Sequence, residues 1–394
     1  MIYIGIDVAS RKHDCCILNE KGDELSVFTI PNDKQGFEYL LSEVEKHSSE
    51  KSLSDARIGL ESTGHYSINI QNYLLHKRLS VKIFNPLQVN MLRKAQSLRK
   101  TKTDKSDSKF LAMLLFSDDS KSYSLPVLSI SELRILTRNR HRLVQMKTKL
   151  KISFSRLITI LSPELPHVVW SANQKSCYAM LLEFPTAKKI ACANIIRLTN
   201  VLSVNSKGKY GREKAEQIRE LAKNSIGLDS RASGFELQQT IRLIQNLQVE
   251  IDVLDKEIKK IMNSCASPIL SIPGIGYTLG AIILSEIGNI ENFSNPGKLL
   301  AFAGLEPSTY ESGNYVASKT PMVKRGSTYL RWAMLQAARL VAYRDKTFSC
   351  YYDKKRSQGK HHFVALTHTA KKLIRVLFHL MKTGQDFAPQ SYTA

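Results

Sequence analysis

The chain has few cysteines, and they lack the spacing that metal-binding or disulfide-stabilised proteins need. Its 394 residues include six cysteines, with no C-x-x-C pair and no accompanying histidine pair at zinc-ligand spacing. Neither a zinc module nor a disulfide framework is expected, and unpaired thiols favour a reducing cytoplasm.

Long apolar runs are also lacking, since none approaches the roughly 18 residues of a membrane span. No basic leader precedes the first apolar segment, so we expect neither a membrane partner nor a signal peptide.

Acidic residues are scarce relative to basic ones. The chain has 57 lysines and arginines against 35 aspartates and glutamates, which gives a formal net charge of +22 and a pI near 9.7. Such a balance indicates a polyanionic partner, and nucleic acid is favoured over an anionic membrane surface. A chain of this length also exceeds one ordinary hydrophobic core, so we expect two or three domains.

Two of the acids end strand-like segments near the N-terminus. Asp7 follows the apolar run Met-Ile-Tyr-Ile-Gly-Ile, and Glu61 follows Ala-Arg-Ile-Gly-Leu. A carboxylate buried at the end of a strand is unfavourable unless a cation or hydrogen-bond donors compensate for its desolvation. Each residue can therefore be a metal ligand or, more simply, the cap of a strand-to-turn junction.

A second pair of acids opens a predicted helix within residues 102–115. Asp104 and Asp107 are three residues apart and so share one face of that helix. Taken singly, each is an ordinary cap or surface residue. Together with the two strand-end acids they form a set that can converge on two divalent cations, an arrangement used for in-line displacement at phosphorus.

The apolar periodicity of the N-terminal region predicts a mixed α/β domain. Three strands, at about 2–8, 13–19 and 24–30, precede a helix, a strand at 56–62, a second helix, a strand at 81–84 and a further helix. This order resembles the ribonuclease-H-like fold. In that fold the first strand, the fourth strand and a late helix meet at one metal site, which is where the four acids would lie.

Two long helices are predicted in the middle of the chain, at about 129–161 and 235–262. Leucine and isoleucine recur in both at heptad spacing, which predicts a coiled coil. The spacing leaves open whether the helices pair as an antiparallel hairpin or pair between protomers. Because the first helix has many cations and almost no acid, it is a candidate nucleic-acid face. The cations singled out on it are Arg138, Arg142 and Lys149.

Further basic or glycine-rich segments are candidates for phosphate contacts. They are Arg99, Lys100 and Lys102 beside the helix acids, Lys209 and Arg212 in a turn among short helices predicted at 163–234, and Gly274 and Gly276 in an Ile-Pro-Gly-Ile-Gly motif. Cations beside the acids would hold a nucleic-acid backbone over metal ions, and a Gly-x-Gly turn presents backbone N–H groups to a phosphate. For each segment, a solvated loop or an ordinary helix–turn–helix joint is the open alternative.

A polar loop between Pro307 and Gly313 places serine hydroxyls near cations. Both residues break regular structure around Ser308 and Ser312. The cations that follow are Lys324, Arg325 and Arg331. A serine near several cations and a helix N-terminus can attack, or be attacked by, a phosphodiester. Serine in a polar loop is more often a turn former, so both interpretations stay open at this point.

The order of these motifs resembles a known family. Over nearly its whole length the chain looks like a DEDD transposase of insertion-sequence family 110. The resemblance rests on Gly5-Ile-Asp7, Glu61-Ser-Thr-Gly, Thr-Asp104-Lys-Ser-Asp107, Gly208-Lys-Tyr-Gly-Arg212, Ile272-Pro-Gly-Ile-Gly276, Gly304-Leu-Glu-Pro307, Ser312-Gly313 and Lys324-Arg-Gly326. Each motif is common alone, whereas their order and spacing together are specific.

The resemblance implies three parts. They are a RuvC-like, RNase H-like domain at 1–125, a helical coiled-coil hairpin region at 126–265 and a mainly α-helical C-terminal transposase domain at 266–394. It also implies roles for particular side chains. Two Mg²⁺ ions, with Mn²⁺ as the alternative, would be bound by the tetrad Asp7, Glu61, Asp104 and Asp107. Ser312 would form a covalent phosphoserine link with DNA.

The resemblance implies partners as well. Double-stranded donor and target DNA would be recombined, with a structured RNA encoded by the element pairing with both. That division of labour would explain why no obvious base-reading helix is present, since base pairing would supply the sequence. A homo-oligomer, dimer or tetramer, would form through the coiled coil, in a bacterial cytoplasm with the nucleoid.

Three alternative functions differ in which of these residues they require. A RuvC-like, metal-dependent, structure-specific endonuclease would use the tetrad alone, with Ser312 merely structural. A basic nucleic-acid scaffold would keep its function after the substitution Asp7→Asn. An actin-like kinase is disfavoured, because the chain shows no second phosphate loop and is strongly basic.

Overall fold

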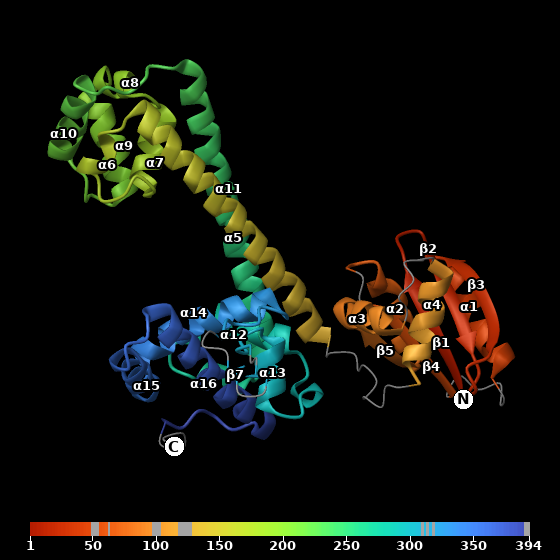
Figure 1. Ribbon diagram of the computed structural model, residues 1–394. Helices are drawn as coiled ribbons and strands as arrows, with labels where there is room; N and C mark the ends of the chain where they lie inside the picture. Colours follow the sequence, from red (N-terminus) through yellow and green to blue (C-terminus); the bar gives the residue numbers. More distant parts are fainter. Residues whose placement is uncertain are drawn as a thin grey trace. The chain divides into compact units, whose positions relative to one another are not determined.

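The computed structural model describes residues 1–48, 55–61, 64–96, 104–116, 128–308, 311–312, 315–316 and 320–389. The chain divides into two compact units, Met1–Leu128 and Ser129–Ala394. A five-stranded sheet with helices forms the first unit, and the second is almost entirely helical (Figure 1). The expected combination of an α/β part and an α part is therefore confirmed. Among the described helices, none is both long and apolar enough to cross a bilayer.

The sheet of the first unit has the order β3-β2-β1-β4-β5. Its strands are β1 (Ile2–Val8), β2 (Lys12–Leu18), β3 (Glu24–Pro31), β4 (Ala56–Glu61) and β5 (Ser80–Phe84). The first three form an antiparallel meander, whereas β4 and β5 run parallel to β1. Each of the five predicted strands is present, because continuous apolar runs between polar turns identify buried strands well.

Helices cover both faces of this sheet. One face packs its isoleucines and leucines against α1 (Lys34–His47) and α2 (Ser67–His76). The other face carries α4 (Asp104–Leu114), and α3 (Pro86–Gln96) contributes Val89 to the same small core as α4. The helix predicted within 102–115 is α4, so helix α3 has no counterpart among the predicted elements. A Cβ added to Gly5 of β1 would lie 1.9 Å from the Ser108 carbonyl oxygen, so α4 rests directly on the strand.

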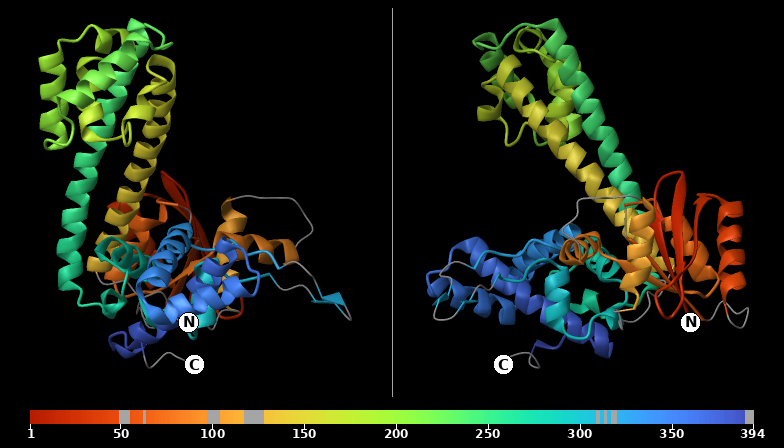
Figure 2. Two further views of the ribbon diagram at one scale, coloured as in Figure 1. Left: turned by 90° about the vertical axis from the view of Figure 1, so that its left-hand side faces the viewer. Right: turned by 45° about the vertical axis from the view of Figure 1, so that its right-hand side comes forward.

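The two long helices of the second unit, α5 (Leu128–Leu161) and α11 (Arg231–Ser264), lie side by side (Figures 1 and 2). Their cross-helix contacts are Arg140 with Asp255, Lys147 with Gln248 and Arg156 with Glu236. Residue numbers rise along one helix as they fall along the other, so the pair is antiparallel and belongs to a single chain. The second helix begins about four residues before its predicted start, capped by Ser230, whose Oγ accepts from Ser233 N–H at 3.2 Å.

Short helices gather at one end of this pair, forming what we call the small lobe (Figure 1). They are α6 (Leu165–Val168), α7 (Lys175–Glu183), α8 (Ala187–Ala191), α9 (Ile195–Ser206) and α10 (Arg212–Lys223). Their apolar side chains share one core with the end of α5 around Phe154 and the start of α11 around Ile241. This confirms the short helices expected from the sequence.

The C-terminal body, residues 268–383, packs at the opposite end of the two long helices. Its elements are η2 (Pro268–Ser271), α12 (Tyr277–Ile287), η3 (Ile290–Asn292), α13 (Pro296–Phe302), β6 (Glu311–Ser312), β7 (Tyr315–Val316), α14 (Thr328–Arg344), α15 (Lys346–Ser357) and α16 (His362–Thr383). A separate core unites the helical elements of this list with Leu133 of α5 and Ile258 of α11. Helix α15 was not predicted. It begins where Asp345 accepts a hydrogen bond from Phe348 N–H at 3.1 Å.

Candidate functional site

The two strand-end acids of the first unit emerge next to each other. Strands β1 and β4 are parallel, with Gly5 opposite Gly59 and Ile6 opposite Leu60. Asp7 follows the last of these pairs on β1, and Glu61 ends β4. A Cβ on Gly59 would lie 3.2 Å from the Leu115 side chain, and one on Gly5 would meet α4. Because side chains two residues apart share a face, Asp7 and Glu61 lie on the α4 face of the sheet.

Helix α4 directs its first turn toward this end of the sheet. Phe116, just beyond the end of the helix, stacks on Tyr3 near the start of β1, with ring centroids 4.1 Å apart. Ser108, near the beginning of the helix, lies against Gly5. The helix therefore runs opposite to β1, and its N-terminal turn points toward the carboxyl end of that strand. Asp104 is the first residue of α4.

Asp107 is a buried carboxylate in this first turn, with its side chain 8% exposed. The guanidinium of Arg93, from α3, lies 3.0 Å from its Oδ1 and also 5.4 Å from the Phe110 ring centroid. A cation thus compensates for the desolvation of the carboxylate. Among the side chains that the structure describes, no three histidines, cysteines or acids gather as a metal cluster. The four-acid site stays a prediction, because the side chain of Asp104 lies outside that description.

Asp14 is an acid at this site that the sequence pattern did not single out. It lies directly opposite Asp7 on β2 and is 4% exposed. Thr29 donates a hydrogen bond of 2.5 Å to its Oδ1, and the ammonium of Lys12 lies 3.6 Å from Oδ2. An acid inside the apolar strand Lys-His-Asp-Cys-Cys-Ile-Leu was the available signal, since such a position needs compensation.

In the second unit, Ser312 is the last residue of the two-residue strand β6, opposite Tyr315 of β7. The segments 306–308 and 321–323, which precede and follow these strands in the sequence, pair in antiparallel orientation, and Ser308 N–H donates to the Pro321 carbonyl at 2.8 Å. We call β6, β7 and these two segments the Ser312 hairpin. The predicted irregular loop is therefore partly a paired structure.

Three predicted nucleic-acid cations gather at the base of the Ser312 hairpin. Gly304 has a φ of 65°, and a Cβ there would lie 2.4 Å from Nη1 of Arg331 and 2.6 Å from the Arg325 carbonyl oxygen. The same Nη1 donates to the Lys324 carbonyl at 3.1 Å. Only a glycine at position 304 allows this close crossing of the two chain segments. Lys324 and Arg325 are exposed.

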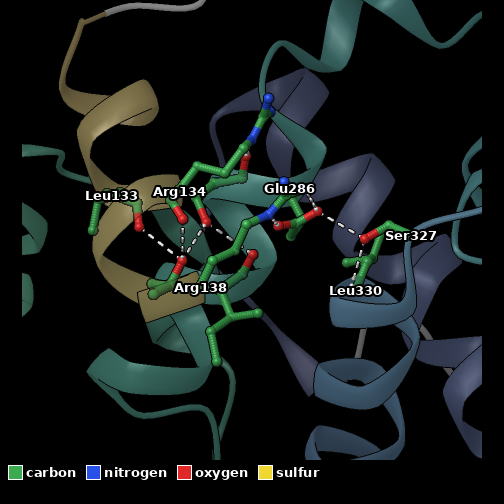
Figure 3. Close-up of polar contacts among 9 residues, drawn as sticks. Leu133, Arg134, Arg138, Glu286, Ser327 and Leu330 are labelled. Atoms are coloured by element: carbon green, nitrogen blue, oxygen red, sulfur yellow. Dashed lines mark hydrogen bonds and ion pairs between the residues drawn. The ribbon is translucent and has the colours of Figure 1, made fainter. Parts of the chain in front are cut away.

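A buried ionic network anchors the same region to α5 (Figure 3). Arg138 donates to both oxygens of Glu286, with Nε–Oε1 2.6 Å and Nη2–Oε2 3.0 Å. Ser327 donates to Oε2 at 2.7 Å and caps α14 by accepting from Leu330 N–H at 3.1 Å. Donating these hydrogen bonds to the buried carboxylate of Glu286 raises the pKa of the Arg138 guanidinium. Arg138, predicted to contact nucleic acid, thus has a packing role that the sequence did not reveal.

The remaining predicted cations are on the surface of the described chain or outside it. Arg142 and Lys149 are exposed on α5, and Lys209 is exposed in the turn before α10. Arg212 opens α10 and forms an ion pair of 2.8 Å with Glu216. The last three, Arg99, Lys100 and Lys102, lie outside the described residues.

The two glycines of the Gly-x-Gly turn have different surroundings. Gly274 has a φ of 101°, and a Cβ there would lie 3.0 Å from the carbonyl carbon of Leu340 in α14. Gly276 is the N-cap of α12, and nothing lies within 4 Å of the position of its missing Cβ. Gly274 is therefore required for packing, whereas Gly276 alone leaves room for a ligand.

Family models match both ends of the chain. A model described as a transposase, of the DEDD type of IS110, matches residues 4–163, and a model of the transposase IS116/IS110/IS902 family matches residues 266–353. The chain belongs to the IS110 family of transposases. The two matches include every acid of the tetrad and Ser312. The segment between them contains the small lobe.

Several relatives in this family align along almost the whole chain. A 44.8 kDa protein of insertion element IS116 from Streptomyces clavuligerus is 24% identical over 98% of this chain and 96% of that protein. The putative transposase of the IS117 mini-circle from Streptomyces coelicolor is 24% identical over 99% and 96%. The pilin gene-inverting protein of Moraxella bovis is 22% identical over 98% and 97%. The protein is thus an insertion-sequence transposase, an enzyme class that cleaves and rejoins DNA.

Proposed function

We propose that this transposase cuts, exchanges and rejoins DNA strands with two groups of residues, a four-carboxylate metal site and a nucleophilic serine. The first unit is the RuvC-like, RNase H-like domain, in which Asp7, Glu61, Asp104 and Asp107 bind two Mg²⁺ ions. The observation that supports this most directly is the emergence of Asp7 and Glu61 at neighbouring strand ends on the face toward which the first turn of α4 points. The three-part division at 125 and 265 also belongs to the proposal.

Four carboxylates are suitable ligands for a hard divalent cation. Carboxylate oxygens are the ligands that Mg²⁺ prefers, and Mn²⁺ shares this preference. The burial of Asp107 against Arg93 indicates that positive charge is needed at this position even without a metal. Bound cations would polarise the scissile phosphodiester and stabilise the charge that develops on it. The cations of the adjoining 93–105 segment would hold the DNA backbone.

Ser312 supplies the covalent link. Its Oγ attacks phosphorus and forms a phosphoserine bond as one DNA P–O bond breaks, and the departing DNA hydroxyl takes up the proton. Attack by a hydroxyl of the other DNA strand reverses this step and releases Ser312. Lys324, Arg325 and Arg331 at the base of the hairpin favour the approach of the phosphate.

No histidine–aspartate pair accompanies Ser312 in the sequence, so its activation requires another source. The acids of one subunit act with Ser312 of a second, in an oligomer assembled through the long helices. Mixing Asp107→Asn chains with Ser312→Ala chains tests this assignment. Recovery of recombination in the mixture is expected, and complete absence of recovery would contradict a site composed from two subunits.

A denaturing gel tests the serine chemistry. Incubation with Mg²⁺ and DNA bearing the element's ends should leave protein covalently attached to DNA. The Ser312→Ala and Asp7→Asn chains should form no adduct, whereas the matched controls Ser308→Ala and Glu24→Gln should form it normally. Glu24 is a suitable control because it is a surface acid of the same unit, paired with Lys109 at 2.9 Å.

Other outcomes of this gel would redirect the assignment. DNA cleavage without an adduct in the parent chain would favour a RuvC-like structure-specific endonuclease. Full function in the Asp7→Asn chain would favour a non-enzymatic nucleic-acid scaffold. Metal binding is measured separately, by calorimetric titration of Mn²⁺ into the parent and Asp7→Asn chains, and equal binding would contradict the four-carboxylate site.

An RNA encoded by the element provides the sequence specificity. The basic surface of the chain suits an additional polyanion, and RNA pairing to DNA would leave the protein to bind backbones. Purified protein should therefore co-isolate with one discrete RNA transcribed from DNA that flanks its own gene. A heterogeneous mixture of cellular RNA would contradict this part of the proposal.

A further inference from the structure

An exposed tryptophan stands on the small lobe, outside the predicted catalytic groups. Trp170, between α6 and α7, is 94% exposed, the highest value among the large apolar side chains that the structure describes. Single exposed apolar residues are common on protein surfaces and do not by themselves indicate a site. The surroundings of Trp170, however, include a pocket and two cations.

The backbone that carries this ring is held in place on both sides. Val169, the preceding residue, is buried in the lobe core. The Trp170 N–H donates to the Tyr210 hydroxyl oxygen at 3.2 Å, and Gln174 Nε2 donates to the same oxygen at 2.8 Å. Tyr210 is itself fixed, because its N–H donates to Ser206 Oγ at 2.9 Å. The indole is thus an exposed group on an ordered support.

A pocket of about 400 Å³ lies beside the ring. Its lining residues are Trp170, Gln174, Lys175, Ser176, Asn205, Ser206, Lys209 and Tyr210. The volume falls in the range of small-ligand sites. Aromatic rings, amides and hydroxyls thus surround a space large enough for a nucleobase with its sugar.

The pocket is positively charged. Lys175 and Lys209 line it from α7 and from the turn before α10, and none of the eight lining residues is acidic. Neither lysine forms an ion pair with another described residue. Gln174, the N-cap of α7, forms no side-chain capping bond to the helix. The partial positive charge of the helix N-terminus is therefore not offset there, and it adds to the charge of the two ammonium groups. The charge is complementary to a phosphate.

We propose that this pocket binds an unpaired nucleotide of a single-stranded nucleic acid. The base stacks on the indole of Trp170, and the neighbouring phosphate is held by Lys175 and Lys209. An aromatic platform with adjacent cations is the usual means of binding single strands without reading their sequence. A base-paired duplex would not present a free base face to the ring. This site is independent of the metal site and of Ser312.

The chain offers a direct reporter for the test. It contains two tryptophans, Trp170 and Trp332, so the tryptophan fluorescence of the full-length Trp332→Phe chain comes from Trp170 alone. Single-stranded oligouridylate and oligothymidylate, a duplex of the same length and inorganic phosphate are titrated into it. Saturable quenching of the Trp170 fluorescence by either single strand supports the proposal. The strand that binds at the lower concentration identifies RNA or DNA as the source of the nucleotide.

Variants separate stacking from charge. In the reporter chain, Lys175→Ala and Lys209→Ala should each weaken the quenching titration several-fold. Lys188→Ala, which removes a cation of the same lobe that pairs with Asp229, should leave it unchanged. Binding of a labelled oligonucleotide should weaken by about tenfold in Trp170→Ala and by much less in Trp170→Phe, because phenylalanine keeps a stacking face.

Four outcomes would overturn the proposal. The first is unchanged Trp170 fluorescence while anisotropy of a labelled strand shows that it is bound. The second is equal quenching by duplex and single strand, and the third is full quenching by inorganic phosphate alone. A fluorescence change that follows protein concentration without nucleic acid would instead assign the ring to a contact between copies of this chain.

Discussion

Removing the guanidinium of Arg138 should destabilise the C-terminal body. This side chain donates hydrogen bonds of 2.6 and 3.0 Å to Glu286, whose own side chain is only 1% exposed. Loss of one partner from a buried ion pair costs about 3–5 kcal/mol, because the remaining charge stays desolvated. Arg138 is itself 41% exposed, so water can reach part of the vacated space. We therefore expect Arg138→Ala to lower the free energy of unfolding by about 2–3 kcal/mol.

The cause of this loss can be isolated with a second substitution. Glu286→Gln keeps an oxygen that accepts from Ser327 but removes the buried charge. In that background the further change Arg138→Ala leaves no unpaired carboxylate, so its additional cost should be under about 1 kcal/mol. The double-mutant cycle should thus show a coupling of at least about 1 kcal/mol between the two residues.

Urea unfolding of the full chain provides the assay. In the Trp170→Phe background the remaining tryptophan, Trp332, reports only on the second unit, since the first has none. It lies on α14, whose N-terminus Ser327 links to Glu286. If the losses of unfolding free energy caused by Arg138→Ala and Glu286→Gln add to within about 0.5 kcal/mol, the two residues are not energetically coupled and this interpretation of the ion pair is refuted.

Two further predictions concern packing and pH. Gly274→Ala should lower the urea midpoint of the second unit, because residue 274 has a φ of 101° and its new Cβ would meet the backbone of α14. Gly276→Ala should leave that midpoint unchanged, because its Cβ would meet nothing within 4 Å. If α12 binds phosphate, Gly276→Ala should also weaken DNA binding. Burial lowers the pKa of His13 below its ordinary value of 6.5, so the unfolded state binds more protons there. The first unit should therefore lose stability as pH falls below about 6.5, which circular dichroism during unfolding would follow. In His13→Phe this dependence of stability on pH should disappear. A pH dependence of equal size in that variant would contradict the assignment of the effect to His13.

The sequence predicted those features that depend on local pattern. The five strands of the sheet and the two long helices follow from continuous or heptad apolar spacing, and both are present. Helix α15 was missed because its charged and aromatic residues show little apolar periodicity, and its start depends on the capping carboxylate of Asp345. The antiparallel pairing of the long helices also required the structure, because heptad spacing is the same for partners within and between chains.

The candidate site shows the same limit in its side chains. Asp7 and Glu61 were found because each ends an apolar run, which is a property of consecutive residues. Asp14 was missed as a member of the site because its proximity to Asp7 arises from strand register. Arg93 was expected among the cations beside the helix acids, but its direct pairing with Asp107 depends on the packing of α3 near α4 and was not predicted. Register and helix packing join residues that are distant in sequence, and no motif of short spacing records them.

The charge of α5 shows why cations on one helix do not by themselves define a nucleic-acid surface. Viewed alone, this helix is a row of arginines and lysines with almost no acid. Several of these cations are paired with acids from other elements, as Arg138 is with Glu286, Arg140 with Asp255 and Arg156 with Glu236. A paired guanidinium gains less from a phosphate, because it must give up its carboxylate first. Nucleic-acid contacts along α5 should therefore involve exposed cations such as Arg142 and Lys149 before the paired ones.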